Sequence, residues 1–177
     1  MNQPFIVFIT GASGVGKTTL VNNLQTKYLD NSTYHFEHFD SNTVPSTEEM
    51  SKQFGSGEKW QETMTRQWVD KLIHNYSNKD VIIFEGQVNI RFIQEAFQKN
   101  NFTNYKIILV DSSEKSMITR LTHDRKQPEL VTEDMKNWRI FLKNQAQEYS
   151  IPIIDTSEKT PDEVVKEFES TLDQHLG

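Results

Sequence analysis

The chain has 177 residues, 25% of them charged and 35% hydrophobic, with a formal net charge of −6 and a pI near 5.4. This length predicts one domain with a substantial core. The acidic balance argues against nonspecific binding to DNA, RNA or an anionic membrane, and the lack of cysteine excludes disulfides and thiolate chemistry. No apolar run approaches transmembrane length, so we expect a cytoplasmic protein.

The first elements surround a glycine-rich loop. The apolar run Phe5–Thr10 predicts a buried strand, and an amphipathic pattern over Lys17–Leu29 predicts a helix. Between them, Gly11–Thr18 matches G-x-x-x-x-G-K-[ST], the P-loop signature, in its required context. Glycines let the backbone N–H groups of such a loop converge on phosphate. The expected phosphate-binding residues are Gly11, Ala12, Ser13, Gly14, Val15, Gly16, Lys17, Thr18 and Thr19.

Two side chains of this loop carry specific roles. Lys17 is expected to reach the β- and γ-phosphates of a nucleotide, and the Thr18 hydroxyl is placed to bind Mg²⁺. The chain contains no Asn-Lys-x-Asp guanine motif, so ATP with Mg²⁺ is the expected cofactor.

The next part of the chain contains a structured insert. Tyr34–Asp40 predicts a second strand. A polar stretch, 41–57, follows, with a short helix near Thr47–Met50 capped by Thr47 or Ser46. Apolar residues spaced by four predict a long helix over Glu58–Tyr76. We expect 41–77 to form a helical insert.

Strands and helices alternate over the rest of the chain. The predicted strands are Val81–Phe84, ending in Glu85, then Lys106–Val110 and Ile151–Ile154. The predicted helices are Ile90–Lys99, Glu114–Arg125, Glu133–Tyr149 and a last one beginning at Pro161 with Thr160 as its cap. This alternation predicts a three-layer α/β fold with a parallel sheet, as one domain over 1–177.

Polar residues at the carboxyl ends of parallel strands are the functional candidates, since ligands bind there. Glu85 is expected to contact Mg²⁺ through a water, although a strand-end carboxylate could instead cap the next helix. Asp40 could take the proton from a hydroxyl that attacks the γ-phosphate, or it could simply open a turn with Ser41–Asn42. Asp111 and Asp155 also end predicted strands.

Cations supply the remaining candidates. Arg120 and Arg125 precede a polar loop and could stabilise the transferring phosphoryl group or stack on a base, or they could belong to a solvated helix face. Four further cations are either ligands of an anionic substrate or ordinary surface charges: Lys52, Arg66, Arg91 and Arg139.

With these residues assembled, the chain resembles the small P-loop kinases, which include adenylate, shikimate and gluconate kinases and chloramphenicol phosphotransferase. Gly11–Thr18 resembles their phosphate loop, and Phe84-Glu85-Gly86 resembles the end of their third strand. The resemblance implies sheet order 2-3-1-4-5 and a short lid over about 120–137 that carries Arg120 and Arg125. It also implies a base-contacting loop at Asp155 and Thr156.

The predicted function is an ATP-dependent phosphotransferase that moves the γ-phosphate to a small-molecule hydroxyl. The alternative within this class is a nucleoside or nucleoside monophosphate kinase. The Asp-Gly-Phe-Pro-Arg motif of adenylate kinase is absent, because Gln87-Val88-Asn89 follows Gly86. The alternative from another class is a non-catalytic nucleotide-binding regulatory protein. Either a monomer or a homodimer is expected.

Overall fold

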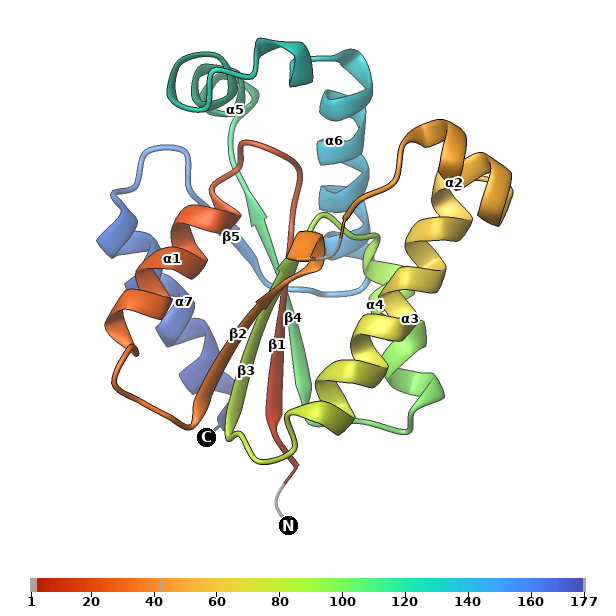
Figure 1. Ribbon diagram of the computed structural model, residues 1–177. Helices are drawn as coiled ribbons and strands as arrows, with labels where there is room; N and C mark the ends of the chain where they lie inside the picture. The colour runs from red at the N-terminus through yellow and green to blue at the C-terminus, as the bar shows by residue number, and fades with distance from the viewer. Residues whose placement is uncertain (1–2, 42, 177) are drawn as a thin grey trace.

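A computed structural model describes residues 3–41 and 43–176 (Figure 1). In these residues, five parallel strands form one sheet in the order β2-β3-β1-β4-β5, as predicted. The strands are β1 (Phe5–Thr10), β2 (Tyr34–His38), β3 (Val81–Gly86), β4 (Tyr105–Asp111) and β5 (Ile153–Asp155). Residues 1–2, 42 and 177 of the predicted domain lie outside the described part.

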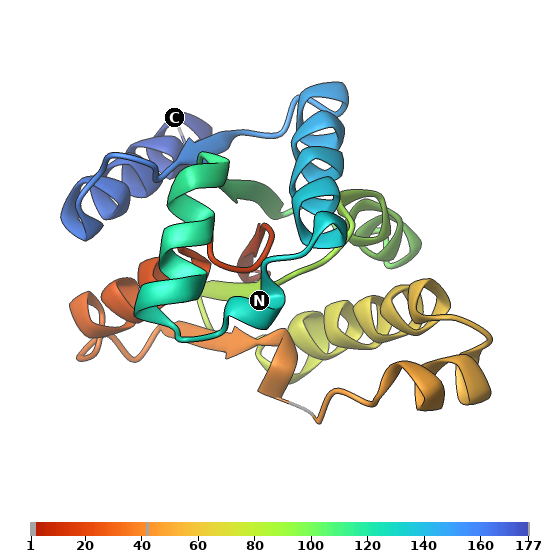
Figure 2. The same cartoon turned by 90° about the horizontal axis from the view of Figure 1, so that it is seen from above.

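Helices cover both faces of the sheet, which gives the predicted three layers. Figures 1 and 2 show one pair of helices on one side, α1 (Lys17–Lys27) and α7 (Pro161–Leu176). The other side carries α3 (Gly57–Asn75), α4 (Ile90–Lys99) and α6 (Glu133–Glu148). The predicted three-layer α/β fold is therefore confirmed.

Side-chain alternation along the buried strands builds a core on each face. In β1, Ile6 and Phe8 pack toward α3 and α4, whereas Val7 and Ile9 pack toward α1 and α7. A strand with helices on both faces must be apolar at every position, which explains the unbroken run in β1. The central strands are thus fixed by burial on both sides.

The insert between β2 and β3 is helical, as predicted. It consists of α2 (Thr47–Phe54) and α3. Ser46 caps α2 and forms a capping box with Glu49. On α3, Trp68 is fully buried, and Trp60 packs edge-on against Phe39 at a ring separation of 5.8 Å. This stripe anchors the insert to the sheet.

Several predicted boundaries were wrong. The short helix predicted near Thr47–Met50 extends to Phe54, and the helix predicted over Lys17–Leu29 ends at Lys27. Strand β2 ends at His38, because Phe39–Ser41 turns into a 3-10 conformation that buries Phe39. Strand β5 begins at Ile153, because Pro152 has no N–H and contributes only its carbonyl, which accepts from Leu109 N at 2.9 Å. The predicted helix Glu114–Arg125 is α5 (Glu114–Thr119) followed by a π-helical turn, Arg120–Asp124.

Within the described residues, every helix is too short or too polar to cross a membrane. The carboxyl ends of the strands meet at one edge of the sheet, under α5 (Figure 1). The loop between β1 and α1 lies at this edge, together with the residues that end β2, β3, β4 and β5.

Candidate active site

The glycine-rich loop has a backbone that depends on its glycines. Gly14 has φ +79° and Gly16 has φ +104°, a region that other residues rarely adopt. A Cβ on Gly14 would lie 2.7 Å from Leu121 Cγ, so the loop also packs closely under the π-helical turn. Helix α1 begins directly after Gly16 without a side-chain cap. Its first N–H groups therefore remain available to an anion.

Lys17 is held inside this loop. The residue is only 8% exposed, and its Nζ donates to the Ala12 carbonyl at 2.8 Å. Burial lowers the pKa of Lys17 to about 8, although the negative charge of Glu85 acts in the opposite direction. A polyanion in the loop would favour the charged form, so Lys17 is suited to binding phosphate.

The end of β3 faces the start of α1. Glu85 is 9% exposed, and its Oε1 accepts from the Thr18 hydroxyl at 3.4 Å and lies 2.9 Å from His38 Nδ1. A threonine hydroxyl beside a carboxylate is a donor set that suits Mg²⁺ with its retained waters. Among the described residues, no group of three or more acidic, histidine or cysteine side chains could hold a metal ion.

Asp40 lies in the 3-10 turn that follows β2, at the same edge of the sheet. Burial, and next the charge of Glu85, raise the pKa of Asp40 above its ordinary value, although Lys17 and His38 oppose this. Asp40 makes no hydrogen bond within the described residues. Asn42, which the alternative turn reading of Asp40 includes, lies outside them. The carboxyl group of Asp40 is thus available to a ligand.

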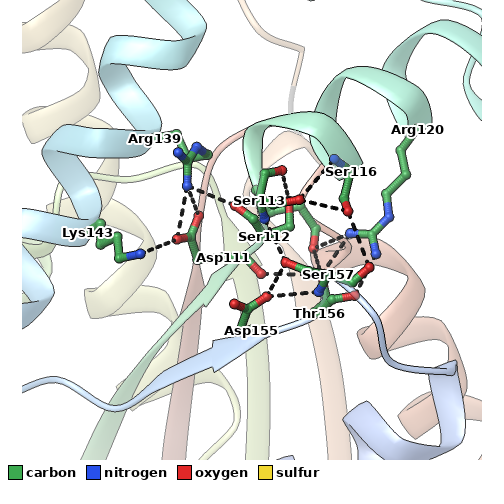
Figure 3. Close-up of polar contacts among 11 residues, drawn as sticks. Asp111, Ser112, Ser113, Ser116, Arg120, Arg139, Lys143, Asp155, Thr156 and Ser157 are labelled. Atoms are coloured by element: carbon green, nitrogen blue, oxygen red, sulfur yellow. Dashed lines mark hydrogen bonds and ion pairs between the residues drawn. The ribbon is translucent and has the colours of Figure 1, made fainter.

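The two predicted arginines behave differently. Arg120 donates from Nη1 to the Val15 carbonyl at 3.1 Å, and from both terminal nitrogens to Thr156 at 2.7 Å (Figure 3). Arg125 is exposed and makes no side-chain hydrogen bond to any residue that the structure describes. Arg125 N bonds to the Arg120 carbonyl at 2.9 Å, five residues back, in the π-helical turn. Arg120 therefore links elements, and Arg125 remains available.

The loop after β5 completes this side of the site. Thr156 is buried and bonds to both the Val15 and the Asp111 carbonyls, at 2.6 and 3.2 Å. Asp155 instead accepts from the backbone N–H and hydroxyl of Ser157, so its carboxylate stabilises the turn (Figure 3). Of the two predicted base-contacting residues, only Thr156 borders the pocket described next.

A pocket of about 480 Å³ opens beside the glycine-rich loop. Helix α1, the π-helical turn and the start of α7 form its walls. Its lining includes Gly14, Gly16, Lys17, Thr18, Thr19, Arg120, Arg125, Thr156, Lys159 and Pro161. This volume suits a nucleotide-sized ligand. The structure therefore brings most of the predicted nucleotide-binding residues to one cavity, while Glu85 and Asp40 lie near Thr18 and Lys17 and do not line it.

Sequence reasoning missed three contacts of this region. Arg139, for which the sequence left open an anion ligand or a surface charge, is paired with Asp111 at 3.1 Å and with the Ser112 carbonyl at 2.8 Å (Figure 3). Gln87 accepts from the Ser13 hydroxyl at 2.9 Å. His38 contacts Glu85. The sequence placed His38 inside the predicted strand Tyr34–Asp40, two residues before its end, so no local signal marked it as a neighbour of Glu85.

Together these features define a P-loop protein. They are a glycine-rich loop between the first strand and the first helix, a lysine and a threonine at the end of that loop, and a parallel sheet in the strand order β2-β3-β1-β4-β5. A family model described as "AAA domain" matches residues 7–148. The chain belongs to this AAA domain family. A search of curated proteins gives no match.

Solved structures with the same fold include several small P-loop kinases. A shikimate kinase from Acinetobacter baumannii in complex with shikimate superposes with a TM-score of 0.64 at 16% identity, covering 98% of this chain and 96% of that one. A gluconokinase from Sinorhizobium meliloti 1021 gives 0.65 at 13% identity, with coverages of 94% and 90%. The APS kinase CysC of Mycobacterium tuberculosis, in complex with AMPPNP and APS, gives 0.61 at 10% identity, covering 98% and 99%. At these identities the likeness concerns the fold.

Proposed function

We propose that this protein is an ATP- and Mg²⁺-dependent kinase that transfers the γ-phosphate to a hydroxyl group of a small molecule. One observation carries the proposal: Lys17 and Thr18 meet Glu85 and Asp40 at the carboxyl edge of the sheet. A nucleotide-sized pocket opens on one side of this group. The fold shared with small-molecule and nucleotide kinases supports the same class.

The pocket suggests how the nucleotide is held. The backbone of Gly14–Thr19 would bind the phosphates, with Lys17 on the β- and γ-oxygens. Arg120 is fixed by its bonds to Val15 and Thr156, so its planar face is suited to stacking on the base. Arg125 is exposed at the pocket and has no hydrogen-bond or ion-pair partner among residues 3–41 and 43–176. It is therefore suited to closing over the phosphates.

The chain's own groups are suited to positioning and proton transfer. Mg²⁺, when bound by the Thr18 hydroxyl and by a water held by Glu85, would neutralise charge on the β- and γ-phosphates. The acceptor hydroxyl oxygen would form a bond to the γ-phosphorus while the bond to the β-phosphate oxygen breaks and ADP leaves. Asp40 would accept the hydroxyl proton and release it to solvent. Its raised pKa makes it a better base than an ordinary aspartate.

The pairing of cations favours a hydroxyl acceptor over a phosphate acceptor. A nucleoside monophosphate needs free cations on the acceptor side. Arg66 is instead paired with Glu62 at 2.6 Å, and Arg91 lies 3.6 Å from Glu95. Arg139 is paired with Asp111. Of the four cations considered from the sequence, only Lys52 lacks an ion pair in the described residues.

The test is turnover of radiolabelled ATP with a panel of hydroxyl metabolites and nucleoside monophosphates. Asp40→Asn is expected to lower kcat at least a hundredfold with a hydroxyl acceptor, because general-base catalysis contributes about 10²–10⁴-fold. Lys52→Ala should leave that reaction unchanged. Asp30→Asn, an exposed aspartate in the turn before β2, is the matched control. A monophosphate acceptor whose turnover depends on Lys52 and survives Asp40→Asn would replace this proposal with a nucleotide kinase. Tight ATP binding without any turnover would favour the regulatory alternative.

A further inference from the structure

His38 is the one histidine whose ring reaches the proposed metal side of the site in the described residues. It is the last residue of β2 and stands directly beside Glu85 in the parallel register of β2 and β3. Its Nδ1 lies 2.9 Å from Glu85 Oε1. An ionised carboxylate can only accept, so the geometry assigns the Nδ1–H as the donor.

The carboxylate that His38 contacts is used on one oxygen only. Glu85 Oε1 accepts from both His38 and the Thr18 hydroxyl. The other oxygen, Oε2, makes no hydrogen bond within the described residues. A buried carboxylate with a single anchored oxygen presents the second one in a fixed direction.

The neighbouring polar groups of β2 are directed elsewhere. His35 stacks on Tyr76 at a ring separation of 3.8 Å. Glu37 accepts from Ser41 at 2.8 Å and from Tyr76 at 2.9 Å. Both residues therefore serve the contact between β2 and α3. His38 alone among these three turns toward Glu85, and its side chain keeps 33% exposure at the crevice.

We propose that His38 is a positioning residue for Mg²⁺ binding: its Nδ1–H fixes Glu85 Oε1, so that Oε2 remains directed toward a metal-bound water beside Thr18. This inference rests on the proposed role of Glu85 and Thr18 in the kinase. Partners of this kind orient the groups that contact a metal, and their loss typically lowers metal affinity by about 10–100-fold.

The test compares His38→Ala, His38→Asn and His35→Asn by calorimetric titration with AMPPNP, once in Mg²⁺ and once in EDTA. The readout is the ratio of the two affinities, which isolates the contribution of the metal. His38→Ala is expected to lower this ratio about tenfold and to leave the affinity in EDTA unchanged. The amide of His38→Asn lies near the position of Nδ1 and should restore most of the ratio. His35→Asn should match the wild type.

Three outcomes would overturn the inference. In the first, His38→Ala lowers both affinities equally, which is a structural effect. In the second, His38→Asn is no better than His38→Ala. In the third, the wild-type ratio is already close to one, so there is no metal contribution for His38 to support. The kinase proposal is tested separately. If the affinity ratios of the variants follow the expected pattern but no acceptor is turned over, the kinase proposal is refuted and the role of His38 in metal binding stands.

Discussion

The ion pair between Asp111 and Arg139 gives a quantitative test of how the end of β4 is tied to α6. Asp111 is 4% exposed, and Arg139 Nη1 lies 3.1 and 3.2 Å from its two oxygens (Figure 3). Lys143 lies 3.7 Å away but is 45% exposed, so it contributes little. Asp111→Asn keeps the shape of the side chain but removes the charge that compensates Arg139.

The expected loss is about 3 kcal/mol of unfolding free energy, the low end of the about 3–5 kcal/mol for breaking a buried pair. The low end applies because the Ser112 carbonyl still accepts from Arg139 at 2.8 Å. In a chain of this size, that loss lowers Tm by about 6–12 °C. Urea unfolding and calorimetry measure both quantities.

A double-mutant cycle separates the pair from its surroundings. Arg139→Met keeps the apolar stem and removes the charge, so Asp111→Asn with Arg139→Met should be less destabilised than the sum of the single variants. The exposed Asp30→Asn is the control and should change stability by less than about 0.5 kcal/mol. A loss of less than about 1 kcal/mol of unfolding free energy in Asp111→Asn, or strict additivity in the double variant, would show that the buried ion pair does not stabilise the end of β4.

Three further predictions concern the turn after β2, acid stability and the two arginines. Gly86→Ala should lower the free energy of unfolding by about 1–3 kcal/mol and also lower kcat, because the added Cβ would lie 2.6 Å from Phe39 Cβ and displace the turn that carries the proposed base. Urea unfolding measures the first effect, and turnover measures the second. Burial raises the pKa of Glu37, but hydrogen bonds from Ser41 and Tyr76 outweigh it and leave the pKa below its ordinary 4.5. The ionised Glu37 therefore contributes stability above pH 4.5, and this contribution is lost as the pH falls through the folded pKa. The Glu37→Gln variant should be less stable than the wild type at neutral pH and should lose less stability on acidification. Equal acid sensitivity of the two proteins in a series of thermal melts would contradict this. Arg120→Ala should lower both Tm and ATP affinity, since three hydrogen bonds are lost, whereas Arg125→Ala should lower ATP affinity with Tm almost unchanged; the opposite pattern would reverse their roles.

Local signals predicted the centre of the fold. The bounds of β1 and α4 follow from apolar runs and turn residues within a few positions, and the glycine-rich loop follows from residue types at fixed spacing. The strand order followed from the resemblance to the small P-loop kinases, not from the residues alone. The cap at Thr160 was also predicted, because a cap and the helix it begins are neighbours in sequence.

Contacts between distant parts of the chain account for what was missed. The end of β2 depends on Phe39 packing against Gly86, which lies beyond the whole insert. The sequence offered a phosphoryl group, a base or solvent as the surroundings of Arg120, but it did not indicate the contact with Thr156, which comes from the loop after β5. Pairs such as these are set by tertiary packing, and neither residue alone indicates its partner.

The central claim is transfer of the γ-phosphate to a hydroxyl oxygen, and phosphorus NMR of a complete reaction tests it most directly. With ATP, Mg²⁺ and an acceptor identified from the panel, we expect a new phosphate monoester resonance that grows in equal amount with ADP. The Asp40→Asn variant should form it at least a hundredfold more slowly. ADP accompanied only by inorganic phosphate, or a new diphosphate resonance on a nucleotide acceptor, would contradict phosphoryl transfer to a hydroxyl group.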